Sequence, residues 1–231
     1  AICETTRGLL QQTGVKPDRI LCVTHCTQLL GILPMSTKTG ALGRAIIWLD
    51  GRADVQARRM MRKFIDARVF ALIAGSPLCG KDCIPKLLWL KDEEPDRYRS
   101  MDCFLDVNGY LMYRTTGRMV MEWTGASVVG MDLKTKQWMK GVMKYVGLDP
   151  AKLPPLVKST DKVWGLTPEA AGELGLLPGT PVIAGAGDAP CAAVGAGAVR
   201  EGAGHICMGT SAWLAVVTSR RPKGKCGVAT I

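Results

Sequence analysis

One acidic residue stands alone in an apolar tract near the C-terminal end of the chain. The stretch GAGDAPCAAVGAGAV (185–199) is built almost entirely from Gly, Ala and Val, and Asp188 is its single carboxylate. The preceding PVIAG predicts a strand, and Pro190 suits the first turn of a helix. Asp188 is therefore expected at the C-terminal end of a strand, where open α/β sheets bind ligands. A carboxylate there can accept a proton from a substrate hydroxyl, or it can serve only as a helix N-cap.

A second stretch with chemical potential follows in CMGTSAW. Gly209, Thr210 and Ser211 form a predicted tight turn between two apolar strands. Glycine lets backbone N–H groups face a phosphate, and two hydroxyls add further donors. An ordinary β-hairpin turn has the same composition. An isolated acid followed by a glycine–hydroxyl turn suggests phosphoryl transfer, in which catalysis consists mainly of positioning and charge stabilisation.

The elements that must position these residues alternate between strands and helices, which predicts an α/β layer fold. Expected helices, each with a stop signal or an N-cap such as Thr167, cover 1–13, 53–71, 84–91, 106–116 and 167–174. Expected strands are ILCVTHC (20–26), which should be buried, IIWLD (46–50), PVIAG (181–185) and two strands within 205–218.

Composition and charge limit the classes of partner. The chain has 231 residues, of which 47% are hydrophobic, so a sizeable core is possible. It contains no apolar run of membrane-spanning length and no signal-peptide layout, and we expect a cytoplasmic protein without a membrane segment. The net charge is +10, with basic clusters at 58–63 and 220–225. Because no basic run is interleaved with aromatic residues, we interpret these clusters as a solvated helix face and a surface loop, and expect no nucleic-acid partner.

Nine scattered cysteines, an odd number, favour reduced thiols over a disulfide framework. Cys22, His25 and Cys26 are close in sequence, as are Cys79 and Cys83. A zinc site needs four ligands in a paired arrangement, which this spacing does not supply. We therefore interpret these cysteines as buried thiols and expect no bound metal.

Taken together and in order, the motifs resemble the FGGY family of carbohydrate kinases, and within it the xylulokinases. The resemblance rests on GAGDAPCAAVGAGAV followed by MGTSAW, and on AIIWLDGRA, ILCVTHCTQLLG, LDVNGYLMYRTTG and LTPEAAGELGLLPGTPVIAG, so it covers nearly the whole chain. It implies two domains of ribonuclease H-like fold, the fold shared with actin and hexokinase. Sugar and ATP would meet in the cleft between the two domains.

The resemblance also implies roles in the reaction. Asp188 would be the catalytic base that takes the proton from a sugar hydroxyl, and the resulting oxygen would attack the γ-phosphate of ATP. Mg²⁺ would arrive on the nucleotide. Gly209, Thr210 and Ser211 match a turn of the family that contacts phosphate.

The expected sugar-binding residues lie earlier in the chain. By resemblance, Gln28 and Trp48 line the sugar site, and Trp48 offers a flat apolar face and an indole N–H donor. Asp50 and Arg52 either bind sugar hydroxyls or pair with each other, and we favour pairing. Leu29-Leu30 departs from the family, because xylulokinases usually carry Met-His there and glycerol kinases Arg-Glu. This departure removes polar sugar contacts and leaves the identity of the sugar open.

Other departures concern the scaffold and the extent of the chain. Glu122 stands where the family often has Asp, and we interpret it as structural. The family's Asp-x-Gly-Thr hairpin and its adenosine-binding Gly-rich motif are both missing. We therefore expect residues 1–197 to form most of the first, sugar-binding domain and residues 198–231 to open the second, nucleotide-binding domain. This truncated chain alone is expected to be inactive.

The predicted function is ATP-dependent phosphorylation of a sugar or polyol hydroxyl by the full-length protein. The sequence leaves the oligomeric state open, and homodimers are common in the family that it resembles. Two alternatives remain at this point. One is an inactive sugar-binding or sensor homologue, motivated by Leu29-Leu30 and the truncation. The other is a basic nucleic-acid-binding domain, motivated by the net charge.

Overall fold

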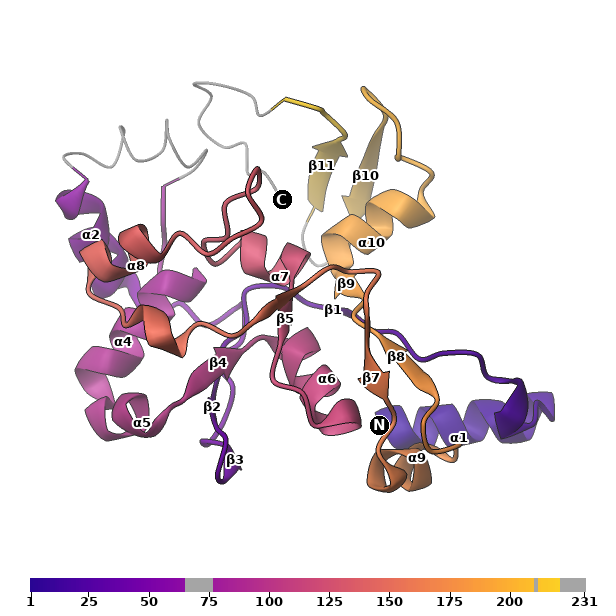
Figure 1. Ribbon diagram of the computed structural model, residues 1–231. Coiled ribbons are helices and arrows are strands. Elements are labelled where there is room, and N and C mark those ends of the chain that lie inside the picture. The colour runs from indigo at the N-terminus through magenta and orange to yellow at the C-terminus, as the bar shows by residue number, and fades with distance from the viewer. Residues whose placement is uncertain (65–76, 210–211, 221–231) are drawn as a thin grey trace.

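The computed structural model describes residues 1–64, 77–209 and 212–220, and has a mixed α/β architecture (Figure 1). Four helices gather on one side of the molecule: α2 (Asp54–Lys63), α4 (Cys83–Glu93), α5 (Pro95–Ser100) and α8 (Lys140–Val146). Two helices lie on the opposite side, α1 (Ile2–Thr13) and α9 (Pro168–Leu174). Between them lie α6 (Val107–Thr116) and α7 (Trp123–Ser127), and 3₁₀ turns cover Pro17–Arg19 and Pro150–Lys152.

The strands are short and pair in small groups. Two pairs are parallel, namely β1 (Cys26–Thr27) with β9 (Ala186–Gly187), and β5 (Met121–Glu122) with β6 (Leu156–Val157). The antiparallel groups are β2 (Leu33–Ser36) between β3 (Gly40–Ala41) and β4 (Cys103–Leu105), β7 (Lys162–Gly165) with β8 (Pro181–Ile183), and β10 (Gly204–Met208) with β11 (Ala212–Val216). Helix α10 (Asp188–Gly195) follows β9 directly and contacts β10.

Three apolar clusters are described, of which the smallest joins β2 to β4 through Met35 and Leu105. Of the other two, the larger core packs α4 with residues such as Phe104, Met121 and Met143, and it stabilises the four-helix side. The smaller core joins α9 to Val182 of β8, with Leu10 of α1 packed against it. Burial of apolar surface of this kind is the main source of folding free energy.

The predicted helices are confirmed where the structure describes them. Helix α1 ends at Gly14 and α6 at Gly117, and both glycines have the left-handed conformation, with φ of 66° and 75°. Thr167 caps α9, because its hydroxyl accepts the N–H of Ala170 at 3.2 Å. Of the helix predicted over 53–71, residues 54–63 form α2, and residues 65–71 lie outside the described part of the chain.

Two predicted strands are wrong, whereas the hairpin within 205–218 is confirmed. In ILCVTHC only Cys26 belongs to a strand, and the segment is not buried, since Leu21 is 84% exposed. Its described hydrogen bonds to another strand segment run to one side only. The Val23 N–H donates to the Pro181 carbonyl, and the Val23 and His25 carbonyls accept from residues 183 and 186. IIWLD makes a single bridge, at Ile46, and then enters a turn closed by the Asp50 N–H and the Ile47 carbonyl at 3.1 Å.

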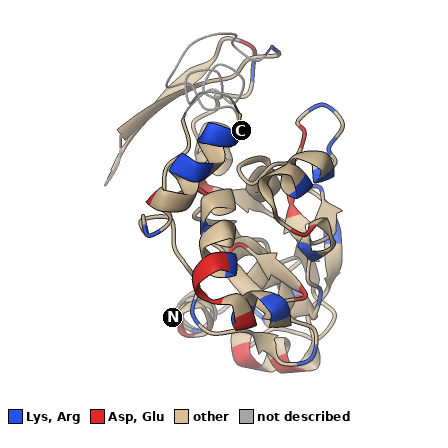
Figure 2. Ribbon diagram, turned by 90° about the vertical axis from the view of Figure 1, so that its left-hand side faces the viewer, with Lys and Arg blue, Asp and Glu red and all other residues tan. Residues whose placement is uncertain are grey.

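The structure tests one of the two basic clusters predicted to lie on the surface, the one at 58–63 on α2. The basic residues of α2 are exposed while Gln56, Ala57 and Met60 are buried, which confirms a solvated helix face. Figure 2 shows basic and acidic residues interspersed over the face that it presents. Of the second basic cluster, Arg220 is exposed, and residues 221–225 lie outside the described part of the chain. In the part of the chain that is described, no helix is long and apolar enough to cross a membrane.

The cysteines require a correction. The described cysteines are free thiols, as expected, but Cys22, Cys26 and Cys79 are exposed and only Cys83 of the motif residues is buried. The reason for the exposure of Cys22 and Cys26 is that their segment pairs on one side only. Burial raises the pKa of the Cys83 thiol to about 12. Among the described residues, no three His, Cys, Asp or Glu side chains come together as a metal site.

Candidate active site

Gln28 and Asp188 lie together at one edge of the central strands. Strands β1 and β9 are parallel, and Thr27 is the register partner of Gly187. Each strand ends there, so Gln28 and Asp188 both follow directly after the carboxyl ends of neighbouring parallel strands. This edge is where open α/β sheets bind ligands. The two predicted residues, which are far apart in sequence, are thus brought to one place.

Asp188 is the first residue of α10, and the N-cap is Gly187. The alternative that Asp188 is merely the N-cap is therefore wrong. Its side chain is exposed, and its Oδ1 accepts the N–H of Ala189 at 2.9 Å. Within the described residues Oδ2 has no hydrogen-bond partner. The partial positive charge at the start of a helix favours a carboxylate at this position, so the fold presents a charged acceptor at the sheet edge.

A buried hydrogen-bond network supports the backbone immediately before Asp188. The N–H of Gly187 donates to the Thr124 hydroxyl at 2.8 Å, and that hydroxyl donates to Glu122. Glu122 is fully buried and also accepts the Ser159 hydroxyl and two N–H groups at the start of α7. The structural interpretation of Glu122 is confirmed. Because a buried carboxylate needs such donors, the network is stabilising.

Gly187 is also the point where Leu29 packs. A Cβ atom at Gly187 would lie 2.3 Å from Cδ2 of Leu29, so the site has no room for a side chain there. The apolar Leu29 therefore fills space beside the residue that precedes Asp188. This contact gives a packing reason for Leu29, which stands where xylulokinases usually carry Met and glycerol kinases Arg.

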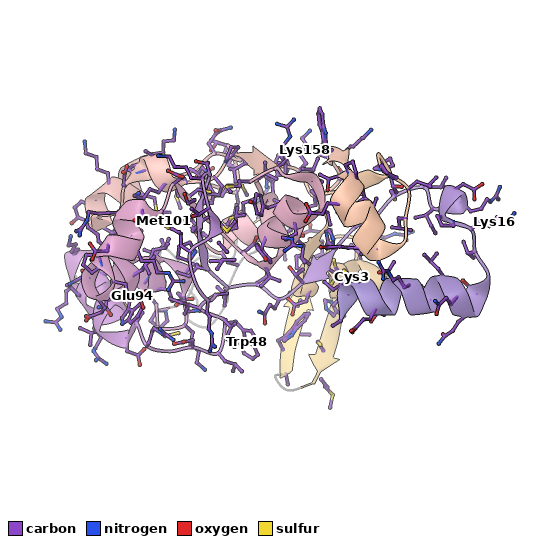
Figure 3. The ribbon with its side chains drawn as sticks, turned by 90° about the horizontal axis from the view of Figure 1, so that it is seen from below. Cys3, Lys16, Trp48, Glu94, Met101 and Lys158 are labelled. Carbon is purple, nitrogen blue, oxygen red and sulfur yellow. The ribbon has the colours of Figure 1, made fainter. Side chains whose placement is uncertain are left out.

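Trp48 and Asp50 belong to the turn that follows the Ile46 bridge. The Trp48 side chain is half-buried and lies at the margin of the molecule in the view of Figure 3. Asp50 pairs with Arg52, whose Nε and Nη2 donate to Oδ2 at 2.9 and 2.6 Å. The pairing prediction is confirmed, and these hydrogen bonds lower the pKa of Asp50. The Arg52 guanidinium also stacks 4.7 Å from the centre of the Trp89 ring.

The predicted phosphate turn is only partly described. Gly209 follows β10 directly and is exposed, whereas Thr210 and Ser211 lie outside the described residues. Strands β10 and β11 pair from Gly204 with Val216 to Met208 with Ala212, so Gly209 is at the tip of this hairpin. The hairpin lies next to α10 (Figure 1), the helix that begins with Asp188.

Sequence reasoning missed three polar residues that are buried or partly buried near this edge. Thr124 bonds to Gly187, Asp106 caps α6, and Lys86 of α4 is fully buried. The signal for Lys86 is its spacing, because Cys83, Lys86 and Leu90 share one helix face and the other two are apolar. Asp106 accepts the Gly109 N–H at 2.7 Å, and burial together with the nearby Glu122 raises its pKa to about 7.

Comparison with known proteins agrees with this geometry. Residues 1–195 match the model of the FGGY family of carbohydrate kinases, N-terminal domain. The xylulose kinase of Bacillus subtilis is 31% identical over 209 residues, which is 90% of this chain and 42% of that protein. The autoinducer-2 kinase of Escherichia coli strain K12 is 29% identical over 229 residues, 95% of this chain and 42% of that protein.

A solved structure shows the same fold. The ligand-bound xylulose kinase of Lactobacillus acidophilus superposes with a TM-score of 0.76 at 23% identity, over 86% of this chain and 40% of that one. The predicted α/β, ribonuclease H-like class is thereby confirmed. The chain spans about 42% of the length of the curated relatives named above. The domain boundary near residue 197 stays a prediction.

Proposed function

Because the chain belongs to the FGGY family of carbohydrate kinases, we propose that the full-length protein transfers the γ-phosphate of ATP to a hydroxyl of a sugar or polyol. The observation that carries the proposal is the placement of Gln28 and Asp188 after register partners of two parallel strands. That placement gives one edge a hydrogen-bonding amide and a charged acceptor.

In this mechanism Asp188 is the general base. Its free carboxylate oxygen accepts the proton of the sugar hydroxyl, the hydroxyl oxygen forms a bond to the γ-phosphorus, and the bond between that phosphorus and ADP breaks. Asp188 stands in the first turn of α10, where the backbone dipole interacts favourably with a negative group. The network from Gly187 through Thr124 to Glu122 keeps the carboxylate in a fixed position.

The proposed site also contains residues that bind the sugar and residues that bind the nucleotide phosphates. Gln28 and Trp48 bind the sugar, the former through its amide and the latter through its ring face and indole N–H. Asp50 contacts the sugar only if it leaves its pairing with Arg52 in part, since both of its oxygens accept from Arg52. Gly209, Thr210 and Ser211 contact the phosphates of the nucleotide, which brings Mg²⁺ as part of the substrate.

The substrate class is a polyhydroxy compound of small size. The relatives named above carry the names xylulose kinase and autoinducer-2 kinase, at similar identity, so neither substrate is favoured by identity alone. Leu29 and Leu30 offer no hydrogen-bonding side chain beside Gln28. We therefore expect fewer polar contacts on that side of the sugar than in a xylulokinase with Met-His.

A coupled ADP-release assay on the full-length protein tests the proposal. The panel contains D-xylulose, L-ribulose, glycerol and autoinducer-2, each with Mg²⁺–ATP. Sugar-dependent ADP release supports the kinase and names its substrate. Silence across the panel, with sugar binding still detected by calorimetry, contradicts the kinase and supports a sugar-binding sensor.

A further inference from the structure

Lys86 is a buried cation in the larger apolar core. Its side chain is fully buried on α4, and its neighbours Leu87 and Leu90 are buried with it. Burial lowers the pKa of Lys86, while the charges of Asp50 and Asp82 act in the opposite direction. A buried ammonium is costly unless it is hydrogen-bonded, so the partners of its Nζ atom are informative.

Both described hydrogen bonds of Nζ go to backbone carbonyls of the candidate site. Nζ donates to the Leu30 carbonyl at 2.8 Å and to the Ile47 carbonyl at 2.8 Å. Leu30 lies two residues after Gln28, and Ile47 directly precedes Trp48. One side chain therefore joins the two segments that carry the proposed sugar-binding residues.

Leu30 itself has an unfavourable backbone conformation. Its φ is 63°, in the left-handed region that non-glycine residues rarely adopt. Such a conformation persists only where the surroundings hold it. The bond from Lys86 to the Leu30 carbonyl is one such restraint. A second restraint is the bridge between Ile32, two residues after Leu30, and Ile46. Its two N–H to carbonyl hydrogen bonds measure 3.0 and 2.8 Å.

We propose that Lys86 is a positioning residue that fixes the Gln28 segment against the Trp48 turn and thereby sets the width of the sugar site. It does not touch the reacting atoms; it acts through the two carbonyls. This inference rests on the proposed kinase function, because it assigns Lys86 to the binding of that enzyme's sugar.

Steady-state kinetics of Lys86→Met in the full-length protein tests the proposal. Methionine keeps the apolar stem and removes the ammonium. The Leu30 and Ile47 carbonyls then lose their shared donor, so some stability is lost as well. We expect KM for the sugar to rise at least ~10-fold, with kcat and KM for ATP changed less than about threefold, since the lost interaction is one of binding.

Lys91→Met is the matched control. Lys91 lies on the same helix and its Nζ donates to a single carbonyl, that of Gly147 at 2.5 Å, away from the sugar segments. Its KM for the sugar should equal that of the parent. Leu87→Ala controls for general destabilisation of the core around Lys86. If Leu87→Ala loses thermal stability but keeps the KM for the sugar, a rise in that KM in Lys86→Met is due to lost positioning and not to lost stability.

Hydrogen exchange gives a second readout that does not need turnover. In Lys86→Met the amides of Ile32 and Ile46 should exchange at least ~10-fold faster, because the restraint next to their bridge is gone. The amide of Leu166, bonded to the Thr180 carbonyl in the smaller core, should not change. If Lys86→Met does not fold, Lys86→Gln, which keeps N–H donors, is measured in the same way.

The outcomes separate this inference from the proposed function. A parent protein that releases no ADP with any sugar overturns the kinase, and unchanged exchange at Ile32 and Ile46 then overturns the restraint as well. An active parent whose Lys86→Met variant keeps the KM for the sugar overturns the role of Lys86 alone. A selective rise in that KM, with faster exchange at the bridge, supports both.

Discussion

Gln28 and Asp188 each stand one residue beyond a register pair, Thr27 with Gly187, in two neighbouring parallel strands. The pairing places an amide and a carboxylate from opposite ends of the chain at the same edge. Neither side chain is drawn into the core, because Gln28 is half-buried and Asp188 is exposed. Both are therefore available to a ligand.

Substitution of Asp188 by Asn removes the proton acceptor while keeping the shape of the side chain. We expect kcat to fall at least ~100-fold, the usual scale for a general base, with sugar affinity largely intact. Kinetics and calorimetry of the full-length protein measure the two effects. Asp96→Asn, an exposed acid of α5 paired with Arg99, is the control. Turnover that survives in Asp188→Asn would remove Asp188 from the chemistry.

Trp48→Ala tests the sugar-binding face. Loss of the indole ring should weaken sugar binding at least ~10-fold, since stacking and the N–H bond are both lost. The effect on kcat should be smaller. Trp164→Ala is the control, because Trp164 is exposed and stacks with Arg118 instead. Equal sugar affinity in Trp48→Ala and the parent would exclude Trp48 from the site.

Gly187→Ala tests the close contact with Leu29. The added Cβ must displace Leu29, so we expect a loss of about 1–3 kcal/mol in the free energy of unfolding. Leu29→Ala should reduce this loss in the double variant, which a thermal or urea unfolding cycle measures. Gly172→Ala in α9 is the control, since a Cβ there meets no atom within 4 Å. Additive effects of the two substitutions would contradict the contact.

Thr124→Val tests the network behind Asp188. Valine has nearly the same shape but leaves the Gly187 N–H and one Glu122 interaction unsatisfied, at a cost of about 1–3 kcal/mol in stability. A lower kcat should accompany it because the backbone before Asp188 is less restrained. Thr124→Ser keeps the hydroxyl and should resemble the parent. Identical melting of the Val and Ser variants would show that the network contributes nothing.

Asp106 predicts how stability depends on pH. Its folded-state pKa is about 7, against 3.8 for the ordinary carboxyl, so between these values the folded state holds a proton that the unfolded state has released. Stability from this group therefore falls as pH rises from about 4 to 7 and is level above that. The difference between the two pKa values of Asp106 corresponds to roughly 4 kcal/mol as an upper bound.

Asp106→Asn removes that titration. We expect a flatter stability profile between pH 4 and 7, and a variant at least as stable as the parent at pH 8, because the amide oxygen can still accept the Gly109 N–H. Asp102→Asn is a control of opposite sign, since bonds from Thr37 lower the pKa of Asp102. An unchanged slope in Asp106→Asn would assign the pH dependence to other groups.

Local signals in the sequence were sufficient for the helices that it predicted, whereas α5, α7 and α8 were not predicted. Gly14, Gly117 and Thr167 act through their own backbone or nearest neighbours, so their effects follow from residue type alone. The strands were harder, because ILCVTHC has the composition of a buried strand but its pairing depends on residues 181–186, far along the chain. The hydrophobic periodicity of a segment does not show which of its two edges will pair with another strand.

The same distinction applies to the candidate site. Asp188 could be found because it is the only acid in its tract, and Asp50 with Arg52 because they are two residues apart. The spacing of Lys86 places it on an apolar helix face, but the partners of Lys86 and Thr124 could not be predicted. Those partners, Leu30, Ile47 and Gly187, are backbone groups of remote segments. Any residue type offers such backbone groups, so sequence alone does not reveal the contact.

The two-residue length of β1 and β9 has a consequence for how this protein can vary. Side chains alternate between the faces of a strand, so one inserted or deleted residue before Gln28 or Asp188 would turn that side chain to the opposite face. Loops elsewhere absorb length changes with little penalty. Loop grafting should therefore keep the lengths of segments 26–28 and 186–188 unchanged. Recombination breakpoints should be placed outside both segments.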